Sequence, residues 1–269
     1  MSGSSWTRVR AVARRHAFVL LRSPHRLFDV VLWPLVDVLL FGSLGVFVAR
    51  QGSGGSIAFG YLLSGIVLWH VVYQAQIALS TGFLEETWSR NLLNLMVTPL
   101  REVEYACGVA LFGMVKLVMG VGVVALTALG FYAFNVGRLG VGLIPIIAVL
   151  LVVGWVIALF VIALVLRFGT GAEALAWGIL FVVMPLSGVF YPVAALPGFL
   201  RPLATALPTT HAFAAGRSLI DGHGMQWGQL GLATGSTVVA GLAALAFLVL
   251  MLGTFRRRGS GAWHAPGPH

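Results

Sequence analysis

Charged residues are scarce in this sequence: they make up 9% of its 269 residues, whereas hydrophobic residues make up 59%. An average soluble domain has about a quarter charged residues, which help to cover its water-facing surface. This chain has too few of them to cover such a surface, so an ordinary soluble domain is excluded. Its length is sufficient for several membrane-spanning helices of about 20 residues each.

Cysteine and lysine are nearly absent. A single cysteine, Cys107, excludes a disulfide framework and a paired-cysteine metal site. The seven histidines lack the spacing of a metal motif, so we expect no metal site. The single lysine, Lys116, stands between Val115 and Leu117, so the Gly-Lys-Ser/Thr ending of a phosphate-binding loop is missing. We therefore expect no catalytic residue and no cofactor bound by this chain.

Acidic residues are outnumbered by basic ones, which leaves a net charge of +9. A charge of this sign could indicate a nucleic-acid-binding protein, but the arginines occur in short flanks between apolar runs. Arginines at such positions contact phospholipid headgroups and set the orientation of the helices in the membrane. We therefore expect membrane lipids, and no nucleic acid, around the basic residues.

Six apolar runs predict an all-α membrane protein with six transmembrane helices. They cover approximately residues 28–48, 57–83, 103–134, 139–168, 174–190 and 230–255. The fifth is short and contains Pro185. Several are longer than the bilayer requires, which permits tilt but fixes no angle.

The arginine distribution predicts that both termini lie in the cytoplasm. With the N-terminus placed there, twelve arginines fall on the cytoplasmic side and four on the outer side. The cytoplasmic set is Arg8, Arg10, Arg14, Arg15, Arg22, Arg26, Arg90, Arg101, Arg167, Arg256, Arg257 and Arg258, and the outer set is Arg50, Arg138, Arg201 and Arg217. An even number of spans agrees with this orientation.

The two ends of the chain differ from the spans. Residues 5–22 are amphipathic and basic, which is typical of a helix lying in the membrane interface; a solvated basic tail is the alternative. We assign residues 1–26 to this interfacial helix. Residues 259–269 are predicted to be a flexible tail.

The segment 83–101 joins the second and third spans on the predicted cytoplasmic side. Leu84, Trp88, Leu92, Leu95 and Met96 fall on one helical face, and Pro99 ends the helix. Such a helix either lies on lipid or fits a groove in a partner protein. Glu85 and Glu86 favour the partner, because anionic headgroups repel carboxylates.

A second informative segment follows the fifth span on the outer side. Prolines at 185, 192, 197, 202 and 208 exclude one continuous helix, yet the segment stays apolar. Irregular backbone at membrane depth is tolerated only against protein or at a cavity. We predict a re-entrant hairpin over residues 190–212, followed by a helix over 212–220 at the surface; the alternative is an apolar outer loop folded over the bundle. Its candidate pathway residues are Phe190, Tyr191, Pro192, Pro197 and Pro208.

Three ionisable residues, Asp37, His70 and Lys116, lie inside predicted spans, where charge is costly. At 1.5 Å per residue, Asp37 lies about 15 Å and Lys116 about 20 Å from the same side of the membrane. We predict a polar cluster in which Asp37 pairs with Lys116, with His70 nearby, fixing the packing of the first three spans. The alternatives are that Lys116 extends to the interface or that each group binds a backbone carbonyl. A direct role in binding substrate is less expected of these charges.

Taken together, the cytoplasmic sequence FLEETWSRNLLNLMVTPLR (83–101) and the outer sequence SGVFYPVAALPGFLRPLATALPTTHAFAAGR (187–217) resemble the ABC-2 family of exporter permeases. This family includes bacterial drug, lipid and polysaccharide exporters. The resemblance covers nearly the whole chain, so residues 1–258 form a single transmembrane domain of this type. It implies a location in the bacterial plasma membrane.

The resemblance also implies partners and sites. It implies a permease dimer above two copies of a separate ATPase, which binds the ATP and magnesium. It implies that 83–101 is the coupling helix, that the N-terminal helix abuts the ATPase, and that spans one and five line the pathway. The candidate ATPase-docking residues are Glu85, Glu86, Trp88, Arg90, Asn91 and Arg101.

Short loops favour a small hydrophobic or amphipathic cargo, such as a drug-like molecule or a lipid; export of a lipid-linked glycan is the alternative. An ion-coupled secondary transporter would use Asp37 and His70 as proton sites. A membrane enzyme would need a catalytic constellation, for which Asp221 and His223 are the nearest candidates, although such residues in a glycine-rich stretch more often form a turn.

Overall fold

The computed structural model describes residues 5–51, 55–88, 102–169 and 174–258, and within these residues it contains helices and no strands. Five of its helices are long and apolar enough to cross a membrane, over Val30–Ala49, Ile57–Phe83, Leu111–Tyr132, Leu143–Phe168 and Trp227–Thr254. They correspond to five of the six predicted spans. The chain is therefore an all-helical, multi-pass membrane protein.

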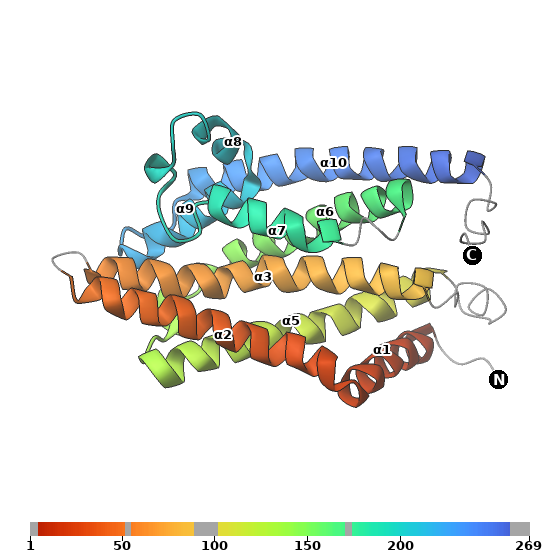
Figure 1. Cartoon of the computed structure of the whole chain (residues 1–269), viewed down its shortest axis with the longest axis horizontal. Helices are drawn as coiled ribbons and strands as arrows, with labels where there is room; N and C mark the ends of the chain where they lie inside the picture. Colours follow the sequence, from red (N-terminus) through yellow and green to blue (C-terminus); the bar gives the residue numbers. More distant parts are fainter. Residues whose placement is uncertain (1–4, 52–54, 89–101, 170–173, 259–269) are drawn as a thin grey trace, which may run out of the picture.

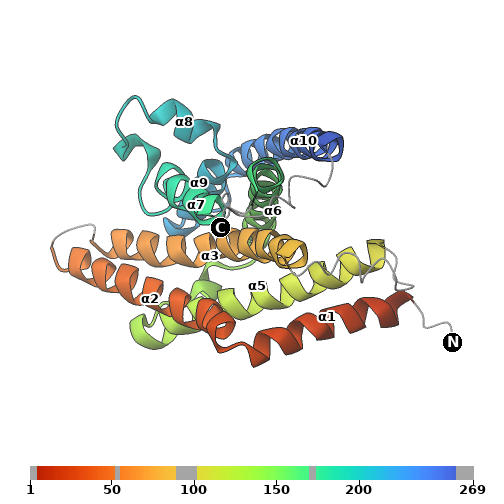
Figure 2. The same ribbon diagram turned by 45° about the vertical axis from the view of Figure 1, so that its right-hand side comes forward.

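Helix α3 (Gly55–Trp88) is the centre of the bundle. One layer, formed by α1 (Ser5–Arg22), α2 (Pro24–Ala49) and α5 (Glu102–Tyr132), lies on one side of it. The other layer contains α6 (Leu143–Phe168), α7 (Ala174–Leu186), α9 (Pro208–Ile220) and α10 (Trp227–Arg258) (Figures 1 and 2). The most apolar stretch of α3 is 83% buried, compared with 28% for that of α2, because neighbours cover α3 on several sides.

Glycines allow the neighbouring helices to approach α3 closely. A Cβ atom on Gly154 of α6 would lie 2.6 Å from Ala75 Cβ, and one on Gly120 of α5 would lie 2.4 Å from Gln74 Nε2. Small residues at helix interfaces are the usual means of close packing in membranes, where apolar helices gain little by leaving lipid. Helix α6 is therefore packed directly onto the α3 backbone, and α5 is packed onto the Gln74 side chain.

Helix α1 packs with one face on the start of α5. Val9, Val12 and Leu20 are buried, and a Cβ on Gly108 would lie 2.6 Å from Val12 Cβ. Arg10 and Arg14 are exposed on the opposite face. A helix is therefore present over the predicted amphipathic segment and packs on the bundle, and its location in the membrane interface stays a prediction.

The predicted fifth span is only partly helical. Helix α7 has 13 residues, which is about 20 Å, against the roughly 30 Å of a bilayer core. It ends at Leu186, after Pro185 and before Gly188, whose φ of +61° favours glycine. The expected count of six full spans is therefore not reached by continuous helices among the described residues.

After α7 the chain passes through a 3-10 turn (Val193–Ala195) and α8 (Arg201–Ala206), and then enters α9. Contacts with α3 define the course of α9: Phe213 packs near Trp69, Gly216 near Leu68, and Gly60 near Ile220. Helix α9 therefore runs alongside the first half of α3 toward its start. Together, α7 and α9 take the place of one interrupted crossing.

The helix expected over 212–220 at the surface starts earlier and lies deeper. It begins at Pro208, and Ala212, Phe213, Ala215 and Gly216 are all buried. These mostly small side chains allow α9 to fit between α3, α6 and α10. An apolar sequence does not distinguish a helix at the bundle surface from one buried between other helices, because lipid and protein interior have similar polarity.

The start of α1, the end of α3, the start of α5 and the end of α10 all lie at one end of the bundle (Figure 1). Helices α3 and α5, which flank residues 89–101, therefore approach this segment at the same end of the bundle as the start of α1 and the end of α10.

Candidate functional site

The interior of the bundle contains an acidic group next to a histidine. Asp37, midway along α2, has a side chain that is 22% exposed, and its Oδ2 lies 3.6 Å from Nε2 of His70, which is 1% exposed. Both residues were predicted to belong to an intramembrane polar cluster, and the structure brings these two together.

The orientation of the His70 ring is set from within α3. Nδ1 lies 3.0 Å from the carbonyl oxygen of Ile66, one turn earlier. Since a carbonyl only accepts hydrogen bonds, Nδ1 carries the hydrogen and Nε2 is directed toward Asp37. Among the described residues, no group is within hydrogen-bonding distance of Nε2.

Lys116, the third residue predicted in this cluster, lies on α5 and is partly exposed. Its helix packs against both α2 and α3. Its pairing with Asp37 stays a prediction.

Aromatic residues lie near His70 and one turn after Asp37. The His70 ring lies 5.6 Å from that of Tyr73, which lies 6.0 Å from that of Trp177 on α7. Phe41, one turn after Asp37 on α2, stacks on Phe190 with ring centroids 4.1 Å apart. These contacts connect α2 with the segment after α7, and α3 with α7.

Helix α3 also buries Gln74, Gln76 and Ser80. Gln76 Nε2 donates to Ser80 Oγ at 3.3 Å, and Ser80 Oγ donates to the Gln76 carbonyl oxygen at 2.9 Å. Gln76 and Ser80 were not among the predicted site residues. The signal that could have found them is the unusual number of polar residues in an otherwise apolar span, since a polar side chain avoids lipid.

The outer segment is held by hydrogen bonds to its own backbone. Tyr191 Oη donates to the Pro185 carbonyl at 2.8 Å, Arg201 Nη2 donates to that of Ala194 at 2.7 Å, and Arg217 donates to that of Gly188. Burial raises the pKa of Tyr191, which keeps its hydroxyl protonated as a donor.

The predicted pathway prolines have structural positions in this segment. Pro192 precedes the 3-10 turn, Pro197 precedes α8, and Pro208 is the first residue of α9. A Cβ on Gly65 of α3 would lie 2.4 Å from the Val189 carbonyl oxygen, so the segment is pressed against α3. The re-entrant depth predicted for 190–212, with its proposed pathway role, stays a prediction.

Asp221 has a structural partner. Tyr61 Oη donates to its carboxylate at 2.8 Å from Oδ1 and 2.7 Å from Oδ2, which ties the end of α9 to the start of α3. His223 is exposed beside it, in a turn that contains Gly222 and Gly224 at positive φ. Among the described residues, no group of three metal-ligating side chains occurs.

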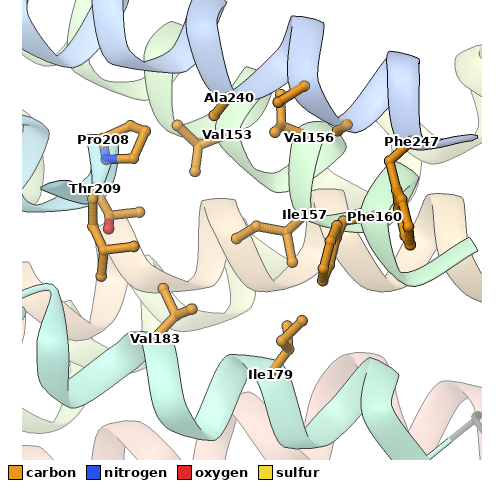
Figure 3. A pocket seen from close by; sticks show the side chains of 13 residues that line it. Val153, Val156, Ile157, Phe160, Ile179, Val183, Pro208, Thr209, Ala240 and Phe247 are labelled. Carbon is orange, nitrogen blue, oxygen red and sulfur yellow. The ribbon is translucent and has the colours of Figure 1, made fainter. Parts of the chain in front are cut away.

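A separate apolar cavity of about 440 Å³ lies between α6, α7, α9 and α10 (Figure 3). Its walls are Val153, Val156, Ile157, Phe160, Ile179, Val183, Leu207, Pro208, Thr209, Ala240, Ala243, Ala244 and Phe247. Phe160 and Phe247 pack against each other with centroids 5.3 Å apart at one end, and Pro208 and Thr209 lie at the other. Its volume is within the range of about 300–1,000 Å³ found for small-molecule sites.

The candidate ATPase-docking residues cannot be placed in the same detail. Arg90, Asn91 and Arg101 lie outside the described residues. Glu85, Glu86 and Trp88 belong to the last turns of α3, and their side chains are outside the described part as well. The tail over 259–269 is also outside it.

Comparison with known families agrees with the sequence resemblance. A family model described as ABC-2 type transporter matches residues 7–220, which extend from α1 to the end of α9. No curated protein matches the chain.

Proposed function

The chain belongs to the ABC-2 type transporter family, and from that premise we propose that it is the transmembrane subunit of an ATP-driven exporter for a hydrophobic or amphipathic molecule. A transport permease of this family normally pairs with an ABC ATPase. Beyond the family, we propose that transport is outward, that the cargo is hydrophobic or amphipathic, and that the ATPase binds at the cytoplasmic end of the bundle.

The observation that carries the proposal is the position of the segments that the sequence predicts to lie in the cytoplasm. The described ends of α3 and α5, which flank the proposed coupling segment, lie at the same end of the bundle as the start of α1 and the end of α10 (Figure 1). Exposed Arg10 and Arg14 on α1 lie at this end. By the positive-inside rule this end faces the cytoplasm, where the ATPase is.

Nucleotide binding is assigned to the partner, because Lys116 is the only lysine and is not in a phosphate-binding motif. Two copies of the ATPase would dock on two copies of the permease, through Glu85, Glu86, Trp88, Arg90, Asn91 and Arg101. We propose the plasma membrane of a bacterium as the location, with both termini in the cytoplasm.

The cargo is inferred from the lining of the interior. The cavity between α6 and α10 is almost entirely apolar, and the ring of Tyr73 lies 5.6 Å from that of His70. Such surfaces suit an amphipathic molecule with a hydrophobic body. A lipid-linked glycan also has an apolar end, formed by its lipid. It is the second candidate, because the segment after α7 is as apolar as the cavity and could contact that lipid.

The test is co-expression of this chain, carrying an affinity tag, with a candidate ABC ATPase. We expect the ATPase to co-purify, and we expect ATP hydrolysis in the reconstituted complex to rise with amphiphiles and not with soluble sugars. Stimulation by polyprenyl-linked glycans alone would favour the glycan exporter. Transport that stops with a proton uncoupler while ATP is maintained would favour the ion-coupled transporter and contradict the proposal.

A further inference from the structure

The apolar cavity of about 440 Å³ lies within two helices that cross the membrane. Its walls extend from Val153 to Phe160 on α6 and from Ala240 to Phe247 on α10. The two stretches lie side by side, with Phe160 packed on Phe247 at one end (Figure 3). A rise of seven residues along a helix is about 10 Å. The cavity therefore extends along the helices, which is also the direction of the acyl chains in a bilayer.

The cavity begins near the middle of the membrane. At 1.5 Å per residue, Val153 lies about 15 Å from the start of α6, and Ala240 lies about 20 Å from the start of α10. The hydrocarbon core of a bilayer is about 30 Å thick, so both positions are close to its centre, where the acyl chains of the two leaflets end. From there the cavity continues toward Phe160 and Phe247, in the direction of the end of α10.

The lining of the cavity favours a hydrocarbon group. No charged side chain is among the lining residues, and the hydroxyl of Thr209 already has a partner in Ser187 Oγ at 2.5 Å. A water molecule in this space would lack the two to four polar partners that buried water requires. An empty space would leave the lining atoms without van der Waals partners. A hydrocarbon chain provides these contacts and needs no hydrogen bond.

Small side chains on α10 make room for the cavity. Ala240, Ala243 and Ala244 line it, and these positions lie on one face of a helix. Leu242, on another face of α10, is 63% exposed. Phe160 is 39% exposed, so the wall of the cavity reaches the surface of the bundle. At this depth the surface is surrounded by the hydrocarbon chains of lipids, which are therefore the molecules available to fill the cavity.

We propose that this cavity is a lipid site, which holds the distal part of one acyl chain of a phospholipid from the leaflet on the side of the end of α10. The terminal methyl group lies near Thr209, between Val153 and Val183, and the chain leaves the cavity past Phe160. The headgroup stays outside the cavity, in the bilayer. The chain supports the junction between α7 and α9 from behind.

This inference goes beyond the proposed export function, because it requires a membrane but no ATPase and no transport. The two are compatible, since an amphipathic cargo would enter the cavity in exchange for the resident chain. In detergent, where phospholipid has been removed, an apolar amphiphile such as dodecanol takes the place of the chain.

The experiment is photo-crosslinking of the full-length chain in phosphatidylcholine nanodiscs. One probe is a phosphatidylcholine with a diazirine at the end of an acyl chain, and the other has the diazirine next to the ester. Mass spectrometry of the peptides identifies the labelled residues. We expect the chain-end probe to label Val153 and Val183, and we expect the ester probe not to label them. Exposed Leu242 and Leu250 report ordinary contact with lipid.

Variants locate the chain in the cavity. Ala244→Leu places a larger side chain in this space, and we expect it to lower the labelling of Val153 and Val183, relative to Leu242, by at least about 10-fold. Ala246→Leu is the matched control, because it makes the same change at an exposed position of α10 that does not line the cavity. If Ala244→Leu cannot be recovered folded, Ala240→Leu provides the same comparison.

Three results would overturn the proposal. The first is equal labelling of the cavity walls in the wild type and in Ala244→Leu. The second is labelling of Leu242 without labelling of Val153 and Val183, which would leave a protein segment, such as a helix of a second copy, as the occupant. The third is equal labelling of the cavity walls by both probes, because a seated chain keeps its ester outside.

Discussion

Ser187 Oγ lies 2.5 Å from Thr209 Oγ1, and this contact joins the end of α7 to the start of α9. Ser187 Oγ also lies 2.7 Å from the backbone carbonyl oxygen of Val183, to which it can donate. Either hydroxyl can be the donor in the Ser187–Thr209 contact. Thr209 is 1% exposed. Two short helices separated by an outer excursion are thus connected through one buried pair of hydroxyls. Interrupted helices in transporters expose backbone groups that side chains have to satisfy.

Removal of this hydroxyl contact is expected to weaken the interrupted crossing. Thr209→Val keeps the side-chain volume and removes the oxygen, and we expect a loss of about 1 kcal/mol in stability, since Ser187 keeps its backbone acceptor. Thermal unfolding in detergent measures the change. Thr205→Val, at an exposed position of α8, is the control and should unfold like the wild type. Equal melting of the two variants would contradict the structural role of the pair.

Substitution of Gly65 tests how closely the segment after α7 packs against α3 at Val189. Gly65→Ala would place Cβ 2.4 Å from the Val189 carbonyl oxygen, and we expect a loss of about 1–3 kcal/mol from the overlap. Gly122→Ala on α5 has open space around its Cβ. The control should be neutral or gain up to about 1 kcal/mol from the helix propensity of alanine. The prediction is that melting curves show a loss of stability for Gly65→Ala and no loss for Gly122→Ala.

The helical architecture was predictable to a large extent, because the length and apolarity of a span are set by the bilayer itself. The predicted limits 28–48 and 230–255 lie within α2 and α10, for example. The fifth crossing could not be predicted as α7 and α9. Pro185 and Pro208 indicated breaks, but apolar residues at 187–220 pack equally well against lipid or protein, so the sequence did not show that Phe213 lies against Trp69.

The candidate site, too, could be predicted from the sequence only in part. Asp37 and His70 were recognised because charge is rare in a span, and in the structure Asp37 Oδ2 lies 3.6 Å from His70 Nε2. Their ring environment depends on Phe190 and Trp177, which come from distant parts of the chain. The apolar cavity is formed by four helices, and apart from Thr209 its lining residues do not differ in character from ordinary lipid-facing side chains.

The cavity provides a prediction about binding. Ala240→Leu places a larger side chain in it, and we expect a weaker effect of apolar amphiphiles, about 10-fold in apparent affinity, because the ligand loses volume and contacts. Ala246→Leu lies on the same helix, is exposed, and does not line the cavity. Dodecanol-dependent melting of the two variants makes the comparison, and equal affinities would show that this cavity is not occupied by the probe.

The orientation of the bundle can be read from cysteine labelling. Cys107 is the only native cysteine, so Cys107→Ser gives a cysteine-free background. In this background, a cysteine at position 90 should react with a membrane-impermeant maleimide only after the cells are opened. One at the exposed position 223 should react in intact cells. Labelling of position 90 from outside would place the proposed coupling segment away from the ATPase.

The central claim is that this chain moves its cargo only when a separate ATPase drives it. The direct measurement is transport of a fluorescent amphiphile in proteoliposomes that contain the permease alone, or the permease with its ATPase, with and without ATP. We predict transport only when both proteins and hydrolysable ATP are present. Transport by the permease alone, at a rate equal to that of the complex, would contradict the account.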